Sequence, residues 1–148
     1  MNRYIIGLLL GALVFLASSC HKDGRFTLEY QVSISDKMWN RGWEKYLDPP
    51  LFGDTIELIA HLQSSRNLYK DERSITEQLV YDGTDWVSKT EGHHGPFPLR
   101  VTVLESQKDW QVVIRAIYYR GEDLIIVQGD AFKPSDGDQS VVFFQKPN

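Results

Sequence analysis

The sequence of 148 residues contains a single cysteine and no excess of positive charge. One cysteine cannot form a disulfide bond or a thiolate zinc site within the chain. The formal net charge of -4 offers no basic surface for a nucleic acid, so we expect no nucleic-acid partner. Hydrophobic residues make up 42% and charged residues 24%, which is the composition of one ordinary globular domain.

The motifs of common enzyme families are missing as well. The sequence has no G-x-S-x-G elbow, no H-E-x-x-H motif and no Walker loop. Its 20 acidic residues allow many carboxylate pairs, so such pairs assign no catalytic role. We therefore predict a non-enzymatic protein, with no catalytic residue and no cofactor.

The first 19 residues have the pattern of a secretory signal. A positive charge at Arg3 precedes an apolar run from Ile5 to Ala17, which is about 13 residues or ~20 Å as a helix. A bilayer core requires about 20 residues, so the run is too short to span it. Small residues follow the run at once and end at Cys20.

Residues 16–20 read LASSC and resemble the lipobox of bacterial lipoproteins, although leucine stands one place further from the cysteine than usual. The resemblance implies cleavage before Cys20, a diacylglyceryl thioether on its sulfur and acylation, for example with palmitate, of the new amino terminus. It also implies an outer-membrane lipoprotein, on the periplasmic face or the cell surface. We expect a signal peptide at 1–19, a short lipid-proximal tether at 20–24 and a single domain at 25–148. An ordinary signal peptide is the alternative.

Alternating apolar and polar residues predict a chain of strands. The expected strands cover residues 26–35, 56–63, 75–81, 86–89, 99–105, 110–119, 124–128 and 140–145. Turn sequences separate them, such as Asp82-Gly83. No helical crossover lies between the later strands, so we expect antiparallel pairing.

One segment, about residues 36–47, has apolar residues at helical spacing and ends before Pro49 and Pro50. The prediction is therefore an all-β protein, an antiparallel two-layer β-sandwich with one short helix. A small lipocalin-like barrel is the alternative, followed by a helix packed on one sheet.

Two groups of residues are candidates for binding. His93 and His94 stand in a Gly/Pro loop and could hold a metal if Glu91 or His61 supplied a third ligand. No known ligand spacing supports this site, so a polar loop is the favoured interpretation.

The second group consists of Trp39, Trp43 and Tyr46 in the expected helix. These three rings could form a stacking platform for sugars. Helical spacing favours the other interpretation, in which the rings form the buried face of the helix.

Part of the chain resembles the fimbrillin-like surface proteins. The resemblance is carried by FGDTI at 52–56, LVYDGTDW at 79–86, the prolines Pro96 and Pro98, and AIYY at 116–119. It implies an exported lipoprotein with β-sandwich structure that builds, caps or anchors surface fimbriae, in some members by donating a strand to a neighbouring sheet. Typical fimbrillins have two sandwich domains, and this chain has room for one.

The sequence thus predicts a lipid-anchored β-sandwich that acts as a non-enzymatic binding or assembly module, with a protein or carbohydrate partner. A fimbrial subunit or anchor is one alternative. A small-ligand carrier is another, provided that the sheet closes into a barrel.

Overall fold

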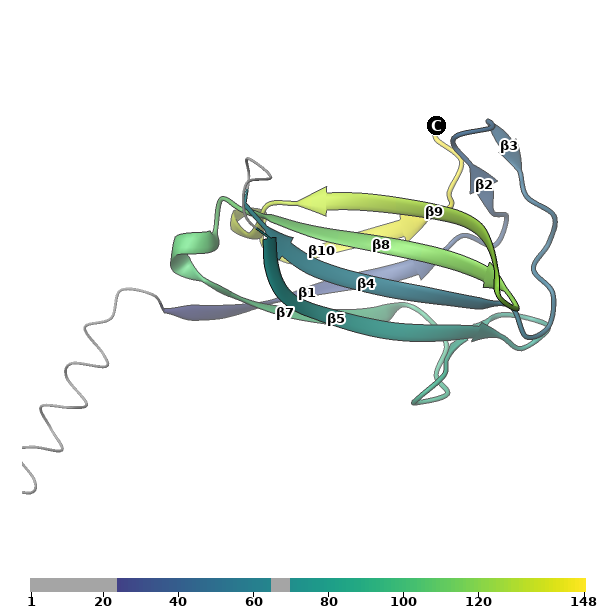
Figure 1. The fold of residues 1–148 in the computed structure, drawn as a ribbon, viewed down its shortest axis with the longest axis horizontal. Coiled ribbons are helices and arrows are strands. Elements are labelled where there is room, and N and C mark those ends of the chain that lie inside the picture. The colour runs from purple at the N-terminus through teal and green to yellow at the C-terminus, as the bar shows by residue number, and fades with distance from the viewer. Residues whose placement is uncertain (1–23, 65–69) are drawn as a thin grey trace, which may run out of the picture.

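The computed structural model describes residues 24–64 and 70–148, which form two β-sheets packed face to face (Figure 1). The larger sheet contains β4 (Thr55–Gln63), β5 (Lys70–Tyr81), β6 (Trp86–Ser88), β8 (Gln111–Arg120) and β9 (Asp123–Phe132). The smaller sheet contains β1 (Arg25–Ile34), β7 (Phe97–Leu104) and β10 (Gln139–Phe143). Strands follow the order β6-β5-β4-β8-β9 in the first sheet and β10-β1-β7 in the second.

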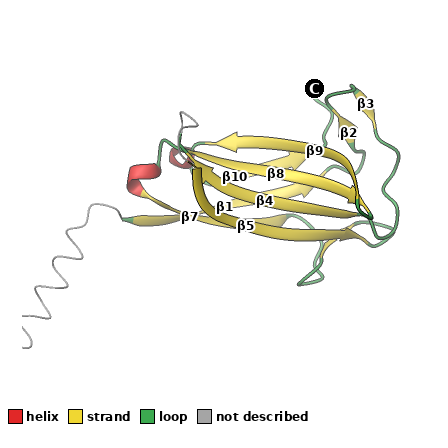
Figure 2. Cartoon of the chain, in the orientation of Figure 1, coloured by secondary structure: helices red, strands yellow, loops and turns green. Residues whose placement is uncertain are grey.

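Helical structure in these two ranges is limited to two 3-10 turns, η1 (Glu105–Gln107) and η2 (Pro134–Asp136), as Figure 2 shows. No helix in the described part of the chain is long and apolar enough to cross a membrane.

The predicted all-β sandwich is confirmed, and each of the eight predicted strands is present. Side chains alternate between the two faces of a strand, and those on the face toward the opposite sheet form the core. In β8 the buried side consists of Val112, Ile114, Ala116 and Tyr118. The apolar periodicity of the sequence therefore located the core.

The barrel alternative is wrong. No ladder of hydrogen bonds joins the two sheets within residues 24–64 and 70–148, so each sheet keeps its own edges. The condition on which a small-ligand carrier rested is therefore not met. A helix packed on one sheet, the third possibility, is also not found in the described residues.

Neighbouring strands pair antiparallel with one exception. β10 runs parallel to β1, in a register that places Phe143 opposite Ile34. The chain leaves β9 in the larger sheet, passes through η2 and enters the smaller sheet, so β10 is not joined to β1 by a hairpin. Passage between layers provides the crossover that a parallel pair needs, without a helix.

The predicted helix at about residues 36–47 is wrong. The segment forms a hairpin of two short strands, β2 (Trp39–Asn40) and β3 (Lys45–Tyr46). The side-chain oxygen of Asn40 accepts hydrogen bonds from the backbone N–H of Gly42 at 2.8 Å and of Trp43 at 3.3 Å. Asparagine often binds the backbone just ahead in this way, which competes with helix formation.

This hairpin lies at the end of the sandwich that is opposite the start of β1 (Figure 1). The ten residues of β1 separate the two ends, which corresponds to about 33 Å of extended chain. The backbone N–H of Trp39 donates to the carbonyl of Phe144 at 2.6 Å and joins the hairpin to the end of β10.

Candidate functional site

The hairpin of residues 39–46, here called the aromatic hairpin, presents three large rings. Trp39 and Tyr46 face each other across β2 and β3, with ring centroids 4.9 Å apart and planes at 79°. This edge-to-face contact is a favoured geometry for aromatic pairs. Trp43 lies in the turn between the two strands.

The rings are not the buried face of the segment, so that part of the prediction is wrong. Trp43 is 70% exposed and Tyr46 is 48% exposed. The neighbouring Met38, at 2% exposure, is the residue that enters the core. A hairpin alternates its side chains across two faces, which frees the rings that a helix would have buried. The three residues nominated from the sequence therefore lie on one hairpin, where Trp43 and Tyr46 are exposed and Trp39 is half-buried.

Two lysines accompany the rings. The ammonium nitrogen of Lys45 lies 5.0 Å from the ring centroid of Trp43. The ammonium of Lys146, near the C-terminal end of the described chain, lies 5.1 Å from the ring of Trp39 and 5.8 Å from that of Tyr46. These distances are within the range of cation–π attraction, so the lysines hold positive charge at the aromatic surface.

Next to the start of β4, a buried carboxylate fixes the loop that leads into this strand. Asp54 is 2% exposed, and its carboxylate accepts a hydrogen bond from the backbone N–H of Leu51 at 2.8 Å. It also accepts the hydroxyl of Tyr118 at 2.5 Å and two guanidinium nitrogens of Arg120 at 3.0 to 3.3 Å. The network therefore joins the loop to the end of β8.

Burial by itself would raise the pKa of Asp54. The hydrogen bonds from Arg120, Tyr118 and Leu51 and the positive charge of Arg120 outweigh burial and lower the pKa of this carboxyl below its usual value. Burial, and then the hydrogen bond to Asp54, raise the pKa of Tyr118 to about 12. The acid is thus charged and the phenol neutral at neutral pH, which is the arrangement of a structural contact.

His93 and His94 point to different partners. The Nε2 atom of His93 lies 3.0 Å from a carboxylate oxygen of Glu91, whereas Nδ1 of His94 lies 3.3 Å from Asp85. His61 is on β4, where its ring contacts Gln63. No group of three metal-ligating side chains occurs in the ranges that the structure describes. The geometry therefore does not assemble the metal site considered from the sequence.

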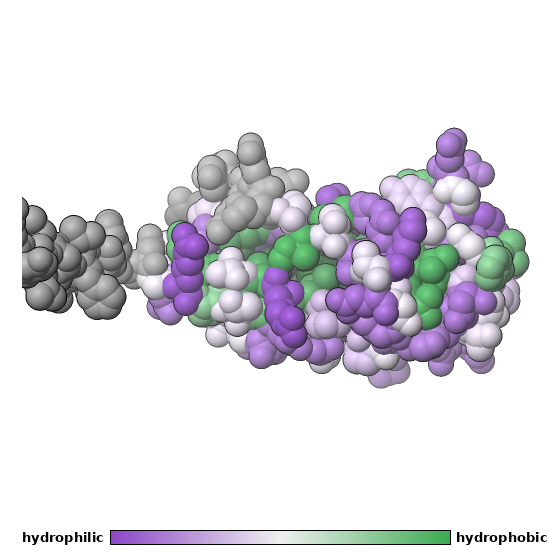
Figure 3. Space-filling model, turned by 90° about the horizontal axis from the view of Figure 1, so that it is seen from below, coloured by the Kyte–Doolittle hydropathy of each residue, from purple (hydrophilic) through white to green (hydrophobic). Residues whose placement is uncertain are grey.

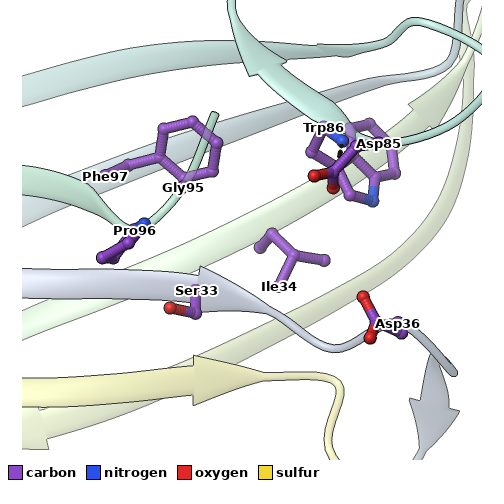
Figure 4. A pocket seen from close by; sticks show the side chains of 8 residues that line it. All are labelled: Ser33, Ile34, Asp36, Asp85, Trp86, Gly95, Pro96 and Phe97. Atoms are coloured by element: carbon purple, nitrogen blue, oxygen red, sulfur yellow. Dashed lines mark hydrogen bonds between the residues drawn. The ribbon is translucent and has the colours of Figure 1, made fainter. Parts of the chain in front are cut away.

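A cavity of about 180 Å³ lies where the end of β1 meets the start of β6 and the segment before β7 (Figure 4). Its lining comprises Ser33, Ile34, Asp36, Asp85, Trp86, Gly95, Pro96 and Phe97. One oxygen of Asp85 accepts the backbone N–H of Trp86 at 2.8 Å, and the other oxygen pairs with His94. The contact with His94 joins the start of β6 to the segment that precedes β7.

Comparison of the chain with models of protein families, with curated protein sequences and with solved structures gives no match. The candidate site is therefore defined by its geometry. Sequence reasoning nominated Trp39, Trp43 and Tyr46 but missed Lys146, because a side chain about a hundred residues further along the chain leaves no local signal.

Proposed function

We propose that this protein is a non-enzymatic binding module of the bacterial cell envelope that binds carbohydrate through its aromatic hairpin. The observation that carries the proposal is the exposure of Trp43 and Tyr46 at the end of the sandwich opposite the start of β1. Exposed aromatic surface of this kind marks interaction sites.

The chemistry of the rings favours a sugar. One face of a pyranose ring carries C–H groups that pack on an aromatic face, while its hydroxyl groups require polar neighbours. Trp43 and Tyr46 supply apolar faces, and tyrosine and tryptophan also carry one polar group each. Lys45 and Lys146 supply hydrogen-bond donors beside those faces. Few rotatable bonds separate the rings from the hairpin backbone, so ordering them on binding costs little.

We expect Trp43→Ala and Tyr46→Ala each to weaken carbohydrate binding by at least about tenfold, or ~1.4 kcal/mol. The reason is that each substitution removes a stacking face without disturbing the core. The measurement is titration calorimetry of the detergent-solubilised full chain with the best ligand from a panel of neutral and acidic oligosaccharides.

Phe52→Ala is the matched control, because Phe52 is an aromatic residue outside the hairpin and is 81% exposed. It is expected to leave binding unchanged. Equal weakening in all three variants, or a wild-type chain that binds no member of the panel, would contradict the proposal.

The proposed anchor is the lipid on Cys20, which lies outside the described residues. Two or more acyl chains give stable membrane attachment. We expect the native chain to run as a single band of mature mass in washed outer membrane, and the Cys20→Ala variant to leave that fraction. Immunoblotting of unboiled membrane and of sheared surface material from the host measures both. A Cys20→Ala variant that stays in the membrane would contradict lipid anchoring.

A fimbrial subunit or anchor remains a second candidate, and one observation favours it. Within the described residues, β7 pairs only with β1, so its outer edge is open. Between β7 and β5 lies an apolar cleft of about 190 Å³, lined by Ala60, Leu62, Ile75, Arg100, Val101 and Thr102. Figure 3 views the molecule from this side and shows apolar surface among polar side chains. Added strands use such edges. A ladder of bands in the sheared fraction would support this candidate instead of the first.

A further inference from the structure

A polar pocket adjoins the aromatic hairpin beside the last described residues. It has a volume of about 310 Å³, near the lower end of the range for small-ligand sites. Its walls include Ser35, Lys37, Tyr46, Gln145, Lys146 and Asn148. Tyr46 belongs to both the pocket and the hairpin, so a ligand that contacts the ring also reaches the pocket.

The charged side chains that line the pocket are positive. Two lysines line it, and none of its lining side chains is a carboxylate. The nearby Asp36 lines the separate cavity between β1 and β6. On the hairpin itself, Arg41 and Glu44 carry opposite formal charges. The positive charge of Lys37 and Lys146 is therefore not matched by a side chain of the pocket.

From this juxtaposition we infer that the ligand of the aromatic hairpin is an acidic saccharide, whose carboxylate binds Lys37 and Lys146 while the sugar ring packs on Tyr46. The inference rests on the proposed carbohydrate binding and specifies its ligand class. Hydrogen bonds between an ammonium and a carboxylate are about twice as strong as neutral ones. Side-chain amides at Gln145 and Asn148 supply further donors for hydroxyl groups.

The position of Lys146 supports this assignment. Its ammonium is within 6 Å of two aromatic rings, so it lies at the boundary between the apolar and the polar part of the surface. A carboxylate attached directly to a sugar ring has the same arrangement of a charge beside a C–H face. The two surfaces are therefore complementary in charge and in polarity.

The test compares uronic-acid and sialyl oligosaccharides with their methyl-esterified counterparts, which keep the ring and lose the charge. The full chain is titrated with each pair at low and at moderate salt. We expect the acid to bind at least about tenfold more tightly than the ester at low salt, and the difference to shrink as salt rises. Lys146→Gln should abolish most of the preference, and Lys37→Gln should reduce it.

Lys108→Gln is the control, since this exposed lysine follows η1 at the other end of the sandwich. It should keep the wild-type preference. Equal binding of acid and ester would overturn the acidic ligand while leaving carbohydrate binding in place. A preference that survives Lys37→Gln together with Lys146→Gln would overturn the assignment to this pocket. Failure of both acids and esters to bind the wild-type chain would overturn the proposed function as well.

Discussion

Replacing Phe143 by alanine is expected to lower the free energy of unfolding by about 3–5 kcal/mol. The ring of Phe143 is fully buried and comes from β10, the strand that enters the smaller sheet parallel to β1. Truncation removes the transfer free energy of the ring and leaves a cavity that the surrounding side chains fill only in part. Urea unfolding followed by tryptophan fluorescence measures the change as a shift in midpoint.

The neighbouring Val142 provides the control, because its side chain points away from the core and is partly exposed. Val142→Ala should change the free energy of unfolding by no more than about 0.5 kcal/mol. If Phe143→Ala were as mild as Val142→Ala, β10 would not be a core strand and the parallel pairing with β1 would be in error.

The second large effect is expected at Asp54. Asp54→Ala should lower the free energy of unfolding by about 3 kcal/mol, because it leaves the buried hydroxyl of Tyr118 and the backbone N–H of Leu51 without their acceptor. Tyr118→Phe removes only one of these bonds and should cost about 1–2 kcal/mol. A smaller loss for Asp54→Ala than for Tyr118→Phe would contradict the network.

The same carboxylate makes the free energy of unfolding depend on pH, and the direction follows from its pKa. Its pKa in the folded protein is lower than the ordinary value of 3.8, so the unfolded chain takes up a proton first as the solution is acidified. The contribution of Asp54 to stability is complete above that ordinary value and is lost as the pH falls toward the folded pKa. Wild-type and Asp54→Ala stabilities should therefore converge in acid. Parallel curves down to pH 2 would show that the carboxylate contributes no linkage.

Much of the fold could be predicted from the sequence, and the reason is local. In strands such as β1 and β8, every second residue is apolar, and this pattern depends only on which face meets the other sheet. Which strands pair with each other cannot be predicted from this local pattern. The parallel pairing of β1 with β10 joins residues about a hundred positions apart, and nothing in either strand encodes it.

The hairpin shows why a periodic pattern misleads over a short segment. Apolar spacing from Met38 to Leu47 fits a helix, but the backbone contacts of Asn40 favour a turn. Docking onto Phe144 also stabilises the extended form, and that contact is remote in sequence. The helical spacing thus predicted burial for Trp43 and Tyr46, which the hairpin leaves exposed.

The position of β1 has a consequence for how the chain acquires its structure. β1 is the central strand of its sheet, yet its partners are residues 97–104 and 139–143. During synthesis the first strand therefore has no neighbour to pair with until most of the chain has been made. Folds dominated by such distant contacts form slowly. The strand that is made first can therefore join its sheet only after β7 has been made, and the sheet is complete only after β10.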